Sequence, residues 1–157
     1  MKASFFAGEI IKWYLRNQRN LPWRHTRDPY AIWISEIILQ QTRVKQGLPY
    51  YQKFMSRYPT VHDLARADQE EVLRLWQGLG YYARFISSTL EGVFPNNYQD
   101  LLKLKGIGKY TAAAIASFAF REPVAVVDGN VYRVLARFFG IDDNHKSPSR
   151  GKTFCRN

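Results

Sequence analysis

The chain has 157 residues, enough for one domain with an apolar core and too few for two well-developed ones, so we predict a single domain over residues 1–157. Its 23 lysines and arginines against 13 aspartates and glutamates give a formal net charge of +10, which suits nucleic acid and would also suit an anionic membrane surface. No apolar run approaches the roughly 20 residues of a spanning helix, and residues 1–8 lack a signal-peptide core, so we expect a soluble intracellular protein, cytoplasmic if bacterial. The only cysteine, Cys155, excludes an internal disulfide and a thiolate metal site built from this chain alone.

Apolar residues recur at helical spacing along almost the whole chain. The first two stripes lie in residues 1–20 and 30–38 and comprise Phe6, Ile10, Trp13, Tyr14, Tyr30, Trp33, Ile34, Ile37 and Ile38. Helix starts are predicted at Asp28 before Pro29, Thr60 with Asp63, Asp68 with Glu71 and Asn97 with Asp100, and helix ends at Gly78, Gly106 and Gly140. The β-branched run at residues 124–127 is too short to seed a sheet, and residues 143–157 lose the periodicity and are expected to fray. We therefore predict an all-α fold of about eight short helices.

Glu36 lies on the helix predicted to begin at Pro29. Helical geometry places Trp33 on one of its flanks and Ile32 and Leu39 on the other, with Gln40 one turn on. A carboxyl group there is expected to be partly desolvated, which favours its protonated form and suits a general acid. Taken alone, a glutamate that reaches out to water is the better interpretation.

Residues 104–112 (LKGIGKYTA) place two glycines around one apolar residue, between two helical segments. Glycine permits the positive φ values that such a turn needs, and it leaves backbone N–H groups uncovered beside a helix N-terminus, where a phosphate can bind. Lys105 and Lys109 add positive charge. The two glycines alone favour an ordinary turn between helices; together with Thr111 and the basic surplus they favour phosphate binding, without sequence readout.

Asp128 precedes the apolar helix predicted over residues 131–138 and is well placed to cap it. A second role is also open to it. Breaking a bond between a sugar and a base builds positive charge on the sugar, and a fixed carboxylate opposite that charge stabilises it. One residue can hold both roles.

The long motifs of this chain resemble those of the adenine DNA glycosylases, helix-hairpin-helix enzymes of base-excision repair. The matching runs are residues 33–44 (WISEIILQQTRV), 78–82 (GLGYY), the hairpin, and 127–131 (VDGNV), and the resemblance covers most of residues 4–141. It implies a helix-hairpin-helix glycosylase core that flips adenine, mispaired with 8-oxoguanine or guanine, out of duplex DNA and cleaves its glycosidic bond.

The resemblance also implies a role for individual residues. Glu36 would protonate adenine, Asp128 would stabilise the charged sugar, Asn130 would position Asp128, and Tyr110 would line the sugar side. DNA would be held by Gln40, Gln41, Thr42, Tyr82, Gly106, Gly108, Lys109 and Thr111, with Gln41 as the wedge in the minor groove and Tyr82 stacking nearby. Trp23 and Arg24, in residues 21–24 (LPWR), would line the way into the base pocket.

Tyr110 distinguishes this chain from enzymes of the endonuclease III type. Those enzymes carry a lysine at this place, and its amine forms a Schiff base that leads to strand cleavage, which a phenol cannot do. Lys109 is adjacent, but one residue along a helix is a rotation of about 100°. The sequence therefore predicts a monofunctional glycosylase.

The chain departs from the family after the catalytic aspartate. Family members continue into helices whose four cysteines bind a 4Fe-4S cluster, and then into a domain that reads the oxidised guanine; Cys155 supplies one thiolate, so no cofactor is expected to bind to this chain alone. The segment between Arg84 and Gly92 is also about three helical turns shorter than the family pattern. We interpret the chain as a truncated or frameshifted form, whose N-terminal helix, residues 1–20, would lack part of its packing partner.

Two other classes compete with the enzyme. A DNA-binding module without catalysis needs only the hairpin and the positive charge, and a purely structural helical domain would leave Glu36, Gln41, Tyr110 and Asp128 as coincidences. The predicted partner is double-stranded DNA with an adenine mismatch. We expect a monomer, with self-association through the uncovered N-terminal helix as the alternative.

Overall fold

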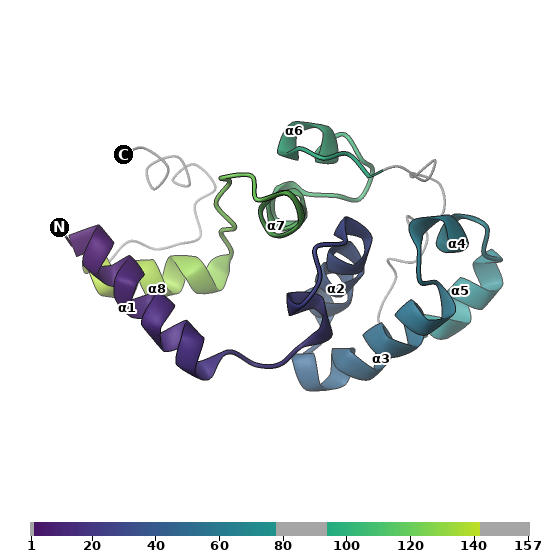
Figure 1. Ribbon diagram of the computed structural model, residues 1–157, viewed down its shortest axis with the longest axis horizontal. Coiled ribbons are helices and arrows are strands. Elements are labelled where there is room, and N and C mark those ends of the chain that lie inside the picture. Colours follow the sequence, from purple (N-terminus) through teal and green to yellow (C-terminus); the bar gives the residue numbers. More distant parts are fainter. Residues whose placement is uncertain (1, 78–93, 142–157) are drawn as a thin grey trace. The chain divides into compact units, whose positions relative to one another are not determined.

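The computed structural model describes residues 2–77 and 94–141, with the side chains of Lys2 and Gln41 outside the description. It places α1 at Lys2–Asn17, a 3-10 turn η1 at Pro22–Arg24, α2 at Pro29–Gln41, α3 at Val44–Arg57, α4 at Val61–Ala65, α5 at Gln69–Leu75, α6 at Tyr98–Leu101, α7 at Lys109–Phe120 and α8 at Gly129–Phe139 (Figure 1). The all-α prediction of about eight short helices is confirmed: these two ranges hold eight α-helices and no strand. Among them, no helix is long and apolar enough to cross a membrane.

The chain divides into two compact units after Phe94. Unit 1 (1–94) contains α1 to α5, and unit 2 (95–157) contains α6 to α8. That residues 1–157 act as one domain stays a prediction. The predicted helix end at Gly78, the shortened segment between Arg84 and Gly92, and the frayed tail at residues 143–157 lie outside the described residues.

Unit 1 is built around α2, whose residues 30–35 are all buried. Asp28 caps this helix by accepting a 3.0 Å hydrogen bond from the backbone N–H of Tyr30, and Pro29 supplies a preset φ at the first position, as predicted. The phenol of Tyr30 donates to the backbone carbonyl of Tyr58 at 2.8 Å, and burial raises its pKa, so it stays a donor. This bond ties α2 to the end of α3.

The aromatic ring of Phe54 holds α3 against α5. It lies 5.3 Å from the rings of both Tyr58 and Trp76, edge to face in each case. The predicted capping box of Thr60 and Asp63 begins α4, and Asp68 caps α5 by accepting from the N–H groups of the first turn. These local caps explain why two such short helices form.

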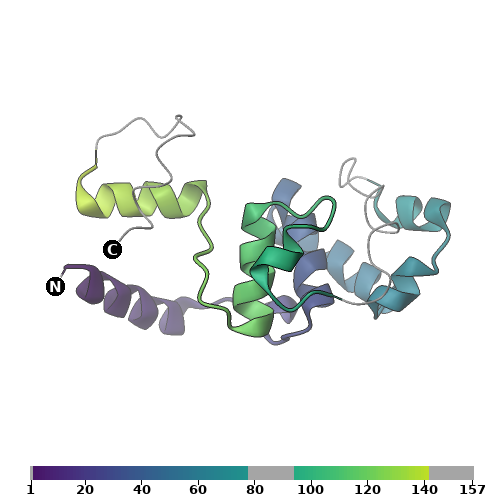
Figure 2. The ribbon, with the colours of Figure 1, turned by 90° about the horizontal axis from the view of Figure 1, so that it is seen from above.

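Unit 2 consists of α6 lying against α7, with α8 following an extended link (Figure 2). Residues 111–116 of α7 are all buried, and the four alanines among them allow close packing. Residues 121–128 form neither helix nor strand, so the prediction that this β-branched run seeds no sheet is confirmed. Gly140 ends α8 in the left-handed conformation, at φ 66°, as its sequence position predicted.

Candidate active site and DNA-binding hairpin

Glu36 lies in unit 1, where the buried part of α2 gives way to the surface. Ile32 and Trp33, one turn before it, are buried; Leu39 is half-buried and Gln40, one turn after it, is exposed. Glu36 itself is half-buried, so the predicted partial desolvation of this residue is confirmed. A carboxyl group at such a border can reach a bound substrate and still be shielded from bulk water on one side.

The end of α2 carries the glutamines that the resemblance to the family implies in DNA binding. Thr42 ends the helix, and its Oγ1 donates to the carbonyl of Ile38 at 2.6 Å. The next helix approaches closely here, because a Cβ placed on the buried Gly47 would lie 2.7 Å from the Thr42 hydroxyl. The exposed Gln40 thus lies on the last turn of α2, next to a tight junction between α2 and α3. The Gln41 side chain and Tyr82 lie outside the described residues.

Trp23 and Arg24 form η1, which contacts α2. The Trp23 ring lies edge to face with that of Tyr51, with the centroids 4.9 Å apart. The Arg24 guanidinium lies 5.5 Å from the centroid of the Tyr14 ring, and its Nη1 donates to the carbonyl of Arg19 at 3.4 Å. Packing inside unit 1 thus orients both predicted base-pocket residues.

In unit 2 the hairpin turns at two glycines, whose backbone conformations differ. Gly106 adopts φ 85°, the left-handed value that the sequence predicted. The same prediction is wrong for Gly108, which caps α7 at φ −84° and ψ 174°, a conformation open to any residue. A Cβ at Gly108 would meet no atom within 4 Å, so glycine leaves bare backbone here rather than avoiding a clash.

Ile107, between the glycines, is buried and anchors the turn, while Gly106, Gly108 and Lys109 are exposed. Tyr110 is 38% exposed at the second position of α7, and the next residue, Thr111, is buried. The exposed backbone at the N-terminus of a twelve-residue helix, next to a lysine, can receive an anion. The two glycines and Lys109 thus form one exposed surface, and the Thr111 side chain is not part of it.

Asp128 caps α8, as predicted, and its carboxylate is held by two neighbours. Oδ1 accepts from the backbone N–H of Val131 at 2.8 Å, and Oδ2 accepts from the side-chain amide of Asn130 at 2.9 Å. Partial burial by itself would raise the pKa of Asp128, but these hydrogen bonds outweigh burial and lower the pKa below its ordinary value. The group is therefore a fixed, ionised carboxylate.

Sequence reasoning missed Arg133, which holds Asn130. The Arg133 Nη2 donates to Asn130 Oδ1 at 2.6 Å, so the amide oxygen is occupied and the amide N–H₂ points to Asp128. Arg133 follows Asn130 by three residues on α8, the spacing at which helical side chains meet, and this spacing could have revealed it. Asp128, Asn130 and Arg133 thus form a continuous polar chain along the first turn.

A four-thiolate cluster does not fit the donors that this chain supplies. The sequence holds one cysteine, Cys155, which lies outside the described residues. Within residues 2–77 and 94–141, no three His, Cys, Asp or Glu side chains form a group that could hold a metal ion. That this chain alone binds no cofactor stays a prediction.

A family model described as HhH-GPD superfamily base excision DNA repair protein matches residues 34–155. The chain is 42% identical to the adenine DNA glycosylase of Buchnera aphidicola subsp. Baizongia pistaciae, over 93% of this chain and 44% of that protein. It is 45% identical to the human adenine DNA glycosylase, over 89% of this chain and 29% of that protein. The chain therefore spans less than half the length of either relative.

Two solved structures share the fold. A thermostable thymine-DNA glycosylase matches with a TM-score of 0.79 and 33% identity, over 88% of this chain and 69% of that one. A non-covalent endonuclease III–DNA complex matches with a TM-score of 0.73 and 25% identity, over 92% of this chain and 72% of that one. The helix-hairpin-helix glycosylase fold predicted from the sequence is thus confirmed.

Proposed function

The chain belongs to the HhH-GPD superfamily of base excision DNA repair proteins, and from this premise we propose that it is a glycosylase that hydrolyses the N-glycosidic bond of adenine mispaired with 8-oxoguanine or guanine. The main support for this chemistry is the Asp128 carboxylate. It accepts hydrogen bonds from the Val131 N–H and the Asn130 amide, and the pKa of Asp128 is lowered. The choice of adenine is supported by the identity to adenine DNA glycosylases, 42% to the Buchnera protein and 45% to the human one.

Asp128 would act on the sugar. Departure of the base leaves positive charge at the anomeric carbon, and a carboxylate that is already ionised and fixed stabilises that charge without having to reorganise. Asn130 would keep the carboxylate in place, and Arg133 would keep Asn130 turned towards it. Asp128 accepts two hydrogen bonds in this arrangement, so its position does not depend on the substrate.

Glu36 would act on the base. A leaving adenine needs a proton on its ring, and a half-buried carboxyl group can supply one more readily than a fully solvated one. Trp23 and Arg24 would line the way to this group, since η1 packs against the helix that carries Glu36. Tyr110, which is partly exposed, would lie along the sugar.

Duplex DNA would be held at separate elements. The exposed backbone of Gly106 and Gly108, with Lys109, would bind phosphate, whereas the buried Thr111 would support the turn and not reach the DNA. Gln40, Gln41 and Thr42, at the end of α2, would enter the minor groove, with Gln41 as the wedge and Tyr82 stacking nearby. The net charge of +10 favours such a partner.

A single-turnover assay tests this function on duplexes that carry one mispair each: A with 8-oxoguanine, A with G, T with G, and U with G. We expect excision from the two adenine duplexes only. Glu36→Gln should bind the same duplexes and lose at least about 100-fold in rate, because an amide keeps the shape and cannot donate an acidic proton. Glu70→Gln is the matched control, since Glu70 is about 80% exposed on α5 and its ion pair with Arg74 is weak.

The outcomes separate the alternatives. Excision of thymine or uracil would redirect the proposal to those bases, and binding without excision of any base would leave a DNA-binding module. Equal rates for parent and Glu36→Gln would remove Glu36 from the mechanism. Borohydride should trap no protein–DNA adduct during turnover, because Tyr110 offers no amine; a trapped adduct would point to Lys109 as a nucleophile.

A further inference from the structure

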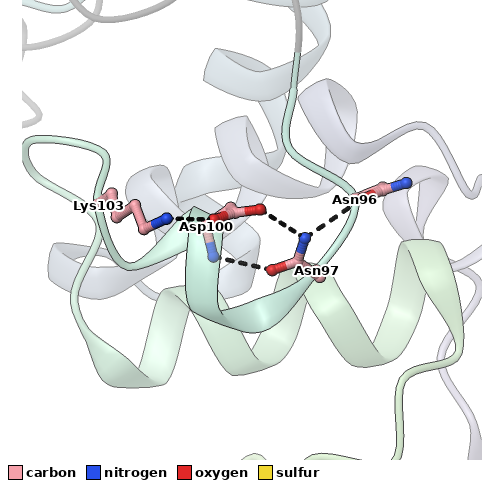
Figure 3. Close-up of polar contacts among 4 residues, drawn as sticks. All are labelled: Asn96, Asn97, Asp100 and Lys103. Carbon is pink, nitrogen blue, oxygen red and sulfur yellow. Dashed lines mark hydrogen bonds and ion pairs between the residues drawn. The ribbon is translucent and has the colours of Figure 1, made fainter.

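The hairpin is supported on one side by α6, which has only four residues. A helix this short is not stable by itself in water, so its caps and packing must hold it. Leu101 and Ile107 are buried and anchor the two ends of the connection to the turn. Figure 3 shows the local cap: Asn97 accepts from the Asp100 N–H at 2.9 Å, and the Asp100 carboxylate accepts from the Asn97 amide and from Lys103.

A second cap of α6 comes from far along the chain. Glu122 Oε2 accepts a 2.7 Å hydrogen bond from the backbone N–H of Tyr98, the first residue of α6, 24 positions earlier. A helix cannot satisfy this N–H group from within, and a carboxylate at a helix N-terminus is also favoured electrostatically. Glu122 is half-buried, so water competes for this bond less than on an open surface.

The backbone of Glu122 is itself tied to the end of α7. Arg121 leaves the helix in the left-handed conformation, at φ 57°, and the Glu122 N–H then donates to the carbonyl of Ala116 at 3.0 Å. Glu122 thus sits at the opposite end of α7 from Gly108, about 18 Å away along twelve residues. As a result, α6 is joined to α7 at both ends: through the turn at Gly106–Gly108 and through the Glu122 side chain.

From this arrangement we propose that Glu122 is a positioning residue of the DNA-binding hairpin. By holding the first residue of α6 to the end of α7, it sets how the two helices cross and therefore how the exposed backbone at Gly106 and Gly108 faces a phosphate. The inference rests on the proposed function, because it requires the hairpin to bind DNA. Glu122 acts through its reach as a hydrogen-bond acceptor; its negative charge by itself would repel DNA.

Three variants of Glu122 separate the effect of its side-chain length from the effect of its negative charge. Glu122→Gln keeps an acceptor oxygen at the same reach and loses the charge. Glu122→Asp keeps the charge and loses one methylene, about 1.5 Å of reach, which breaks a 2.7 Å bond. Glu122→Ala loses both. Glu70→Ala, on the other unit, is the control for removing one exposed negative charge.

The experiment measures the affinity of the full chain for matched and mismatched duplexes by fluorescence anisotropy, from 50 to 200 mM salt, well below the melting temperature of every variant. Glu122→Ala and Glu122→Asp should bind both duplexes about fivefold more weakly, the effect of one lost hydrogen bond. Their slope of log affinity against log salt should be shallower by about 0.9, the value for one phosphate contact. Glu122→Gln and Glu70→Ala should match the parent in slope. A change in stability alone would not alter the slope of the folded protein.

Parent-like affinity and slope in Glu122→Asp would overturn the inference and leave the proposed function intact. Weakened binding and a shallower slope in Glu122→Gln would overturn it too, because that variant keeps the acceptor. Should Glu122→Ala fail to fold, the Asp and Gln variants alone decide the question. A parent that binds neither duplex would overturn the proposed function and this inference together.

Discussion

At the scale of the residue, Asp128 shows how one side chain serves fold and chemistry. The hydrogen bond from the Val131 N–H makes Asp128 a helix cap and also stabilises its negative charge. The Asn130 side-chain amide donates a second hydrogen bond to the carboxylate. Because these bonds outweigh the effect of burial, they lower the pKa of Asp128. The ionised form is thus stabilised by the fold before any substrate binds.

Asp128→Asn should fold, because asparagine is also a good helix cap, and should lose excision while it keeps DNA binding. The sign of the pH effect follows from the lowered pKa. The ionised carboxylate stabilises the parent above the pKa of the unfolded chain, about 3.9, and this stabilisation is lost as the pH falls through the lower folded value. The difference in unfolding free energy between parent and variant, measured by urea denaturation, should therefore shrink between pH 6 and pH 3. A constant difference over that range would contradict the assignment.

Arg121 is the one non-glycine residue with positive φ among those described. The left-handed conformation strains a residue with a Cβ, and glycine removes this strain. Arg121→Gly should therefore raise the unfolding free energy by about 1 kcal/mol, measured by urea denaturation, with Arg137→Gly on α8 as a control that should destabilise. A loss of stability in Arg121→Gly would mean that the Arg121 side chain makes a larger contribution than the backbone strain.

At the scale of the element, the proposed phosphate binding of the hairpin depends on backbone that glycine leaves uncovered by a side chain. The backbone at Gly108 accepts any residue, and a Cβ there meets no neighbour. Substitution should therefore change the ligand surface and leave the fold intact.

Gly108→Gln should keep the melting temperature and weaken binding to matched and mismatched duplexes alike, because a side chain at this position covers the backbone that faces phosphate. Anisotropy titrations measure the affinity. Gly8→Gln on α1 is the matched control, since a Cβ there also meets nothing within 4 Å. A loss confined to mismatched DNA would show that Gly108 contacts the lesion instead of the backbone.

Most elements could be predicted from the sequence, for a local reason. The caps at Asp28, Thr60 and Asp128 bind N–H groups two or three residues away, so their spacing alone identifies them. Gly140 likewise closes a turn with Ala136. Arg121 was not predicted as a helix end, because its left-handed conformation carries no signature in the residue type.

At the scale of the whole molecule, α1 leaves a large apolar surface open. Its exposed apolar side chains are Phe5, Ile10, Ile11, Trp13, Tyr14 and Leu15, and Trp13 is 63% exposed. Of the stripe identified in the sequence, Ile10, Trp13 and Tyr14 are exposed and Phe6 is half-buried. Each large side chain left in water forgoes about 1.5–3 kcal/mol of burial, against a total stability of about 5–15 kcal/mol for a typical domain.

Amide hydrogen exchange should therefore be much faster in residues 5–15 than in residues 109–120, whose central part, residues 111–116, is buried. The sample must be shown to be monomeric by sedimentation, because self-association through α1 would protect it. Protection of α1 that rises with protein concentration, and falls in Trp13→Gln, would identify this helix as the contact. Equal protection of both helices in a monomer would show that α1 is buried in solution.

The sequence by itself determined most helices, the caps at Asp28, Thr60 and Asp128 and the turn at Gly106, because each depends on neighbours within about one turn of helix. The candidate residues Glu36 and Tyr110 came from the resemblance to the family, and their roles stay predictions. Only the tertiary structure decided that Glu122 reaches the N–H of Tyr98, that Gly47 meets Thr42, and that Gly108 needs no special φ. Contacts between residues far apart in the chain depend on how helices pack and on side-chain rotamers. Neither leaves a periodic pattern in a single sequence.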